Sequence, residues 1–66
     1  MQIILNGKPE IVNDRMTAAA LVQARGLAVT RVAVEINEDV IPRRLLDETP
    51  LHDGDRVEIV TFVGGG

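Results

Sequence analysis

The residues of this chain best suited to chemistry are three consecutive glycines at its end, Gly64, Gly65 and Gly66. They follow an alternating, strand-like run and present a glycine carboxylate on a narrow arm. Glycine has no Cβ and the greatest conformational freedom of any residue, so three glycines at a terminus add nothing to a fold. The segment from Phe62 to Gly66 could reach roughly 15 Å when extended, enough to enter another protein's active site. The alternative is a frayed end without a role.

The other polar residues form no convincing site. His52 beside Asp53 could suggest a proton-transfer pair. Adjacent residues in an Asp-Gly turn are more often a solvated loop, and no third group is evident. The carboxylates of Asp47, Glu48, Asp53 and Asp55 lack the spacing of a calcium loop. We therefore expect solvated turn carboxylates and no metal site.

The composition restricts the class of protein. Sixty-six residues form one small domain with little room for an internal cleft. The chain has no cysteine, so any sulfur chemistry would need sulfur supplied from outside. A net charge of -3 argues against nucleic-acid binding and favours a basic partner. Since the sequence contains no long apolar run and no export signal, we expect a soluble cytoplasmic protein that does not bind membranes.

The apolar pattern predicts an α+β domain with the element order β-β-α-β-β-β. Asn6-Gly7 is typical of a tight hairpin turn, Thr17 of a helix N-cap, and Gly26 of a helix end. The strands are expected in residues 1–5, 9–12, 31–36, 40–41 and 56–63, and the helix in residues 18–25. One helix against one face of a mixed sheet of about five strands suits so small a domain. The predicted domain spans residues 1–63, and residues 64–66 form a flexible glycine tail.

This order, together with the tail, resembles the ubiquitin-like β-grasp superfamily, and within it the ThiS family of sulfur carriers in thiamine biosynthesis. The matching fragments cover nearly the whole chain: Met1 to Ile3, Asn6, Thr17, Ile36-Asn37, Val40 to Arg43, Asp53 to Asp55 and the terminal glycines. Each fragment is weak alone, but their order and spacing make the match fairly specific. One departure is Leu46, where these carriers often have tryptophan, and it concerns either packing or a partner contact.

The resemblance implies a protein cosubstrate and not an enzyme. In such a carrier, an E1-like (ThiF-like) adenylating enzyme uses ATP and magnesium to convert the Gly66 carboxylate to an acyl-adenylate. Sulfur from a cysteine desulfurase or another persulfide donor then displaces AMP and leaves a thiocarboxylate. A thiazole synthase (ThiG-like) receives this sulfur. Gly64 and Gly65 would let the arm thread into the partner sites, and the carrier would bind no cofactor of its own.

The end of the last strand is a candidate docking surface, formed by Val60, Phe62 and Val63. Strict alternation places Val60 and Phe62 on the face opposite Val57 and Ile59. A bulge or a strand end could break this parity and fold Phe62 over the edge of the core. The sequence leaves both readings of Phe62 open.

Three alternatives to this carrier function remain. The small subunit of molybdopterin synthase also has a β-grasp fold and a glycine thiocarboxylate, but it is usually longer and has prolines ahead of its tail. A ubiquitin-like protein modifier would be revealed by isopeptide adducts, and Lys8 is the only lysine here on which it could build chains. A plain interaction module would have no chemistry at Gly66.

Overall fold

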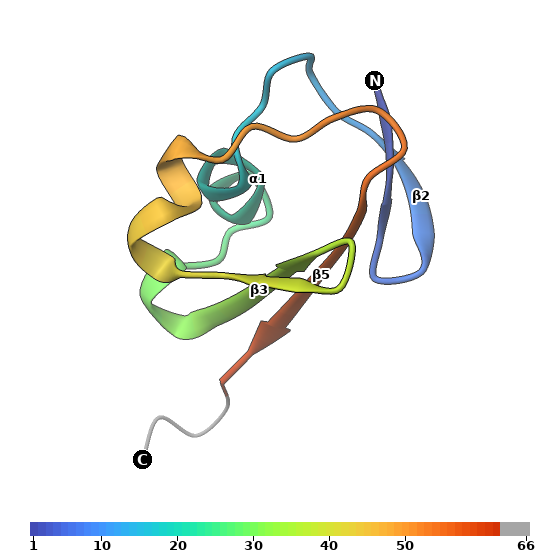
Figure 1. Cartoon of the computed structure of the whole chain (residues 1–66). Coiled ribbons are helices and arrows are strands. Elements are labelled where there is room, and N and C mark those ends of the chain that lie inside the picture. The colour runs from blue at the N-terminus through green and yellow to red at the C-terminus, as the bar shows by residue number, and fades with distance from the viewer. Residues whose placement is uncertain (63–66) are drawn as a thin grey trace.

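The computed structural model describes residues 1–62, which form a five-stranded mixed sheet with an α-helix packed on one face (Figure 1). The strand order is β2-β1-β5-β3-β4. Strands β1 and β5 are parallel, and the other neighbours are antiparallel. The elements are β1 (Gln2–Leu5), β2 (Lys8–Ile11), α1 (Ala18–Ala24), β3 (Val32–Ile36), β4 (Asp39–Ile41) and β5 (Arg56–Thr61). The predicted order of strands and helix is confirmed, whereas the proposed boundary between residues 63 and 64 lies outside the described residues.

Two short 3-10 helices correct the sequence prediction. They are η1 (Val29–Arg31) and η2 (Arg43–Glu48). Arg31 closes η1 by donating its backbone N–H to Ala28 over 2.9 Å, so β3 begins at Val32 and not at Arg31. Helices this short contain too few residues to show a hydrophobic periodicity in the sequence, so the sequence did not predict them.

The helix begins and ends close to where its capping residues indicate. The hydroxyl oxygen of Thr17 accepts the backbone N–H of Ala20 over 3.1 Å, which satisfies one of the free donors of the first turn. The helix ends at Ala24, one residue earlier than expected, and Arg25 is its C-cap. Gly26 follows with a φ of 75°, a conformation that glycine adopts without strain.

Both hairpin turns contain an asparagine with a positive φ. The φ values are 48° and 82° at Asn6-Gly7, and 51° and 73° at Asn37-Glu38. Two successive positive φ values give the turn twist that matches a right-handed hairpin. The two turns flank β5, and they bring both asparagine side chains against its backbone.

The core lies between the sheet and α1, and the segment containing η2 closes one side of it. Leu46 in η2 is only 2% exposed, so in this chain its side chain packs in the core. The buried apolar side chains are Ile3, Leu5, Ala18, Ala19, Leu21, Val22, Val32, Val34, Ile36, Leu46, Leu51, Val57 and Ile59.

Replacing Leu46 with alanine tests the role of η2 in the core. Because Leu46 is buried, Leu46→Ala is expected to lower the free energy of unfolding by about 2 to 5 kcal/mol. Val40→Ala is the control, since Val40 is 68% exposed; it should change that free energy by less than about 0.5 kcal/mol. Urea unfolding monitored by circular dichroism measures both. Equal effects would contradict this account of the core.

Candidate functional site

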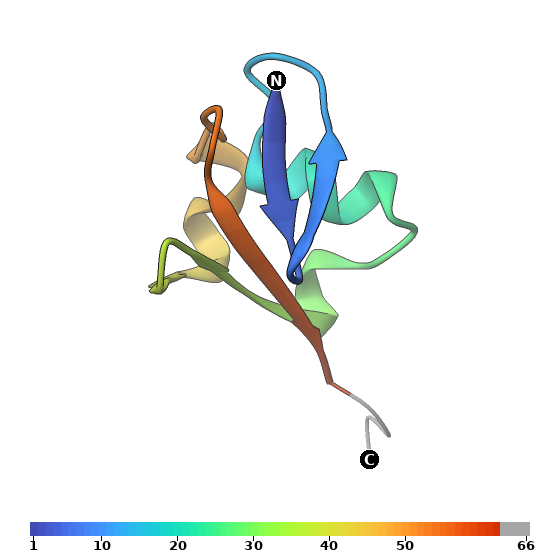
Figure 2. The same ribbon diagram turned by 90° about the vertical axis from the view of Figure 1, so that its right-hand side faces the viewer.

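Strand β5 is the element that carries the predicted arm. It occupies the centre of the sheet, between β1 and β3. Figure 2 shows β5 running from the end of the molecule near Met1 toward the opposite end, where the described chain stops at Phe62. The direction of β5 therefore sets where the following residues leave the domain. Val63, Gly64, Gly65 and Gly66 lie outside the described residues, so their predicted roles stay predictions.

Asn6 holds β5 from the β1 side. The backbone N–H of Asn6 donates to the carbonyl oxygen of Val57 over 2.9 Å. Beyond this point the Asn6 side chain takes over, because its Oδ1 accepts the N–H of Ile59 over 2.8 Å and its Nδ2 donates to the carbonyl oxygen of Ile59 over 3.3 Å. The side-chain amide of Asn6 thus satisfies the N–H and the carbonyl oxygen of Ile59. A further residue of β1 would otherwise have to pair with these two groups, but the chain turns at Asn6.

Asn37 holds the beginning of β5 from the β3 side. Its Oδ1 accepts the N–H of Arg56 over 3.0 Å, and its backbone N–H donates to the carbonyl oxygen of Arg56 over 2.8 Å. At the other end of the strand, the N–H of Phe62 donates to the carbonyl oxygen of Arg31 over 2.9 Å. Strand β5 is therefore fixed on both sides along most of its length.

Asp55 corrects the expectation that every acidic turn residue is solvated. Its carboxylate is buried, accepting the side-chain N–H of Asn37 over 3.0 Å and the backbone N–H of His52 over 2.8 Å. Asp53 accepts the backbone N–H of Gln2 over 2.8 Å. Both carboxylates organise the approach to β5, and His52 is largely exposed. Residues 1–62 contain no group of three potential metal-ligating side chains.

Burial alternates along β5 as far as Val60, and the last strand residue, Thr61, is exposed although it has the same parity as the buried Val57 and Ile59. Val57 and Ile59 are buried, whereas Val60 and Phe62 are each 53% exposed. Phe62 is therefore not buried in the core, and the exposure of Val60 agrees with the face predicted from parity. Whether this face docks a partner remains a prediction.

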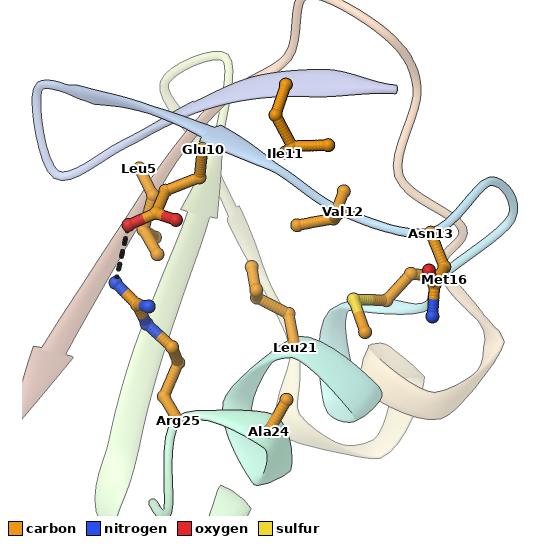
Figure 3. A pocket seen from close by; sticks show the side chains of 9 residues that line it. All are labelled: Leu5, Glu10, Ile11, Val12, Asn13, Met16, Leu21, Ala24 and Arg25. Carbon is orange, nitrogen blue, oxygen red and sulfur yellow. Dashed lines mark hydrogen bonds and ion pairs between the residues drawn. The ribbon is translucent and has the colours of Figure 1, made fainter.

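A hollow lies between β2 and α1 and is small for a ligand pocket. Its volume is about 210 Å³, below the several hundred Å³ typical of ligand pockets. Glu10 and Arg25 form an ion pair of 3.0 Å across its mouth, and Val12, Met16 and Leu21 line its floor (Figure 3). No helix among residues 1–62 is long and apolar enough to cross a membrane.

Residues 3–66 match the family model described as the ThiS family. This chain belongs to the ThiS family. The crystal structure of the thiamine biosynthesis protein ThiS from Geobacter metallireducens superposes on it with a TM-score of 0.84 and 38% sequence identity over 100% of both chains. The ubiquitin-like β-grasp fold and the resemblance to the sulfur carriers of thiamine biosynthesis are thereby confirmed.

Two relatives of the ThiS-family chain differ in length. The sulfur carrier protein ThiS of Thermus thermophilus is 34% identical over 62 residues, which cover 94% of this chain and 95% of that protein. A thiazole synthase of Paramagnetospirillum magneticum is 36% identical over all 66 residues. This chain spans only 20% of that synthase, so the match concerns one part of a longer protein.

The side chains of Asn6 and Asn37 bind the backbone of β5, a role that the sequence did not reveal. The sequence predicts a turn at Asn6, and the structure places both Asn6 and Asn37 in a tight turn after an alternating strand. Their side-chain bonds to β5 join residues 53 and 19 positions apart, and turn chemistry does not predict such contacts. Asparagine in a hairpin turn is the only signal that could have suggested them.

Glycine substitutions separate the two contacts. Asn6→Gly retains the positive φ of the turn and removes the bonds to Ile59, so it should cost about 1 to 2 kcal/mol of unfolding free energy. Amide hydrogen exchange should accelerate at Ile59 and not at Arg56. Asn37→Gly is the matched control and should show the reverse pattern. Equal acceleration at both amides in either variant would contradict local fixing of β5.

Proposed function

We propose that this ThiS-family chain carries sulfur as a thiocarboxylate on Gly66. The observation that carries the proposal is the family match, which extends through Gly66 in a chain without cysteine. Since no thiol is available within the chain, the carried sulfur is bonded to carbon at the terminal carboxyl group. Strand β5 supports this role because Asn6 holds it on one side as far as Ile59, and the β3 side holds the chain as far as Phe62.

The proposed chemistry begins with activation, because a carboxylate is a poor electrophile. A ThiF-like adenylating enzyme joins the Gly66 carboxylate to AMP from ATP, with magnesium on the nucleotide, and pyrophosphate leaves. The terminal sulfur of a persulfide, from a cysteine desulfurase or a related donor, then attacks the acyl carbon and AMP leaves. A thiol cleaves the resulting acyl disulfide and releases the thiocarboxylate.

The proposed acceptor is a thiazole synthase. One relative that matches this entire chain over a fifth of its own length is named thiazole synthase. That relative contains a segment similar to this chain within a protein named thiazole synthase. Such an arrangement is consistent with a carrier that passes its sulfur directly to the synthase. In this proposal the chain is a cosubstrate in the cytoplasm, its partners supply the catalytic groups, and Gly64 and Gly65 pass through their narrow sites.

Intact mass spectrometry tests the proposed chemistry. After incubation with ATP, magnesium, a ThiF-like enzyme and sulfide, the chain should be heavier by the difference between one sulfur and one oxygen atom, located at Gly66. Sulfide displaces AMP directly, so no reductant is needed. Isopeptide adducts, or sulfur on an internal residue, would reject the proposal.

Variants of the arm serve as controls for this experiment. Deleting Gly65 and Gly66, or adding a C-terminal tag, should abolish adenylation and leave the circular dichroism spectrum unchanged. Gly65→Ala should have an intermediate effect, because the added Cβ narrows the arm and restricts its backbone.

Phe62→Ala tests docking by the exposed face of β5. Because Phe62 is 53% exposed, the free energy of unfolding should fall by much less than the about 3 to 5 kcal/mol typical of a buried phenylalanine. Affinity for the adenylating enzyme should fall severalfold. Urea unfolding and isothermal titration calorimetry measure the two quantities. A large loss of stability with unchanged affinity would show that Phe62 serves packing alone.

A further inference from the structure

A second hollow lies on the α1 side of the sheet, where α1, η1 and η2 contact one another. Its volume is about 260 Å³, and its apolar lining comes from Ala19, Val29 and Leu46. Arg43 and Arg44 also line it. Since Ala19 and Leu46 are buried and the two arginines are exposed, an apolar base is combined with cationic side chains open to solvent. We call this surface the arginine hollow.

The arginine hollow lies close to the point where the described chain ends. Val29, which lines it, belongs to η1, the same short helix as Arg31. The carbonyl oxygen of Arg31 accepts the N–H of Phe62 over 2.9 Å. In Figures 1 and 2, η1 is the green helix beside the described end of β5. One short helix therefore connects a wall of the hollow to the start of the arm.

The positive charge at this end is not neutralised within residues 1–62. The ion pairs within 4.0 Å among those residues include none of Arg31, Arg43 and Arg44. Asp47 lines the hollow as well, but it forms no ion pair within that distance. One carboxylate beside two guanidinium groups leaves the hollow positively charged. The net charge of -3 therefore does not describe the surface next to the arm.

Acidic groups gather at the opposite end of the domain, around the beginning of β1. Asp14 pairs with the ammonium group of Met1 over 3.1 Å, and Asp53 accepts the backbone N–H of Gln2 over 2.8 Å. The charge is thus distributed unevenly along the direction of β5. A partner that approaches the arm from the α1 side meets cations, and carboxylates complement them.

The proposed sulfur transfer brings two proteins to the chain at the same time. The adenylating enzyme holds the acyl-adenylate of Gly66 while a second protein presents its persulfide. The predicted docking face around Val60 points away from α1, because Val60 alternates with the buried Ile59. The arginine hollow is on the α1 side, so it stays accessible when that face is covered.

We propose that the arginine hollow docks an acidic segment of the protein that delivers the persulfide. The inference rests on the proposed function and names the surface that its sulfur donor uses. Carboxylates of the segment would form bidentate ion pairs with Arg43 and Arg44, and an apolar side chain between them would cover Leu46. Docking beside η1 raises the effective concentration of the persulfide near Gly66. Its terminal sulfur attacks the acyl carbon, AMP leaves, and an acyl disulfide joins the donor to the chain.

The hollow fits an acidic protein segment better than two other occupants. A two-fold dimer through this surface would bring Arg43 and Arg44 of one copy against the same residues of the other copy. A nucleic acid would need a longer stripe of lysines and arginines than the hollow offers.

Capture of the acyl disulfide tests the inference. The unsubstituted chain is mixed with a ThiF-like enzyme, ATP, magnesium and a persulfide-loaded cysteine desulfurase, without free thiol, and the conjugate with the desulfurase is measured by non-reducing electrophoresis. Arg43→Glu and Arg44→Glu should each slow its formation about fivefold or more, and the loss should shrink at high salt. Arg44→Gln removes the charge without reversing it, so its effect should be smaller. Free sulfide needs no docking, so with sulfide all three variants should form the thiocarboxylate at the rate of the unsubstituted chain.

Arg15→Glu is the matched control. Arg15 is exposed and follows Asp14, at the end of the domain opposite Phe62, so this variant makes the same change in net charge away from the hollow. It should form the conjugate as fast as the unsubstituted chain. Because all the substituted residues are exposed, the midpoint of urea unfolding should change little in any variant.

Each outcome decides the inference. Equal slowing in Arg44→Glu and Arg15→Glu would show a general charge effect and overturn it, as would equal slowing with sulfide and with the desulfurase. Unchanged conjugation with a weakened affinity for thiazole synthase would assign the hollow to the acceptor and overturn it. Dimerisation that Arg44→Glu alters, measured by sedimentation, would assign the hollow to a second copy. Thiocarboxylate formation from sulfide with unchanged conjugation in every variant would overturn only this inference. Absence of adenylation in the unsubstituted chain would overturn the proposed function with it.

Discussion

The parallel pairing of the first and last strands organises the whole domain, because β5 can enter the centre of the sheet only between β1 and β3. The N–H of Ile4 donates to Asp55 and that of Asn6 to Val57, and the antiparallel ladder with β3 completes the other side. Since the pairing of β1 with β5 ends at Leu5 and Val57, no residue of β1 pairs with the backbone of Ile59 on that side. The Asn6 amide satisfies those groups, and β5 continues in register toward the arm.

The central strand β5 contributes side chains both to the core and to the exposed face of the sheet. Side chains alternate between the two faces of a strand, so Val57 and Ile59 enter the core while Glu58 and Val60 point away from it. In a domain of this size almost every inward position is needed for the core. The outward positions of β5, which include Glu58 and Val60, are therefore free for contacts outside the domain.

The carboxylates of the chain illustrate two uses of the same charge. Asp55 is buried and accepts hydrogen bonds from Asn37 and His52, so its charge stabilises the turn ahead of β5. Glu35 and Glu58 are register partners on the face of the sheet opposite α1, without an ion pair within 4.0 Å in residues 1–62. A buried polar group must be satisfied within the fold, whereas the half-buried Glu35 and the exposed Glu58 remain accessible to water.

The sequence by itself determined the strand faces, the first hairpin, the helix start at Thr17 and the family, because each depends on local alternation, turn chemistry or the spacing of short motifs. The exposure of Val60 and Phe62 followed from the same period-two rule. Only the tertiary structure decided the rest. The contacts of Asn6 with Ile59, the burial of Asp55 and the pairing of Glu35 with Glu58 join residues far apart in the chain, and they depend on strand order and register, which local patterns do not fix.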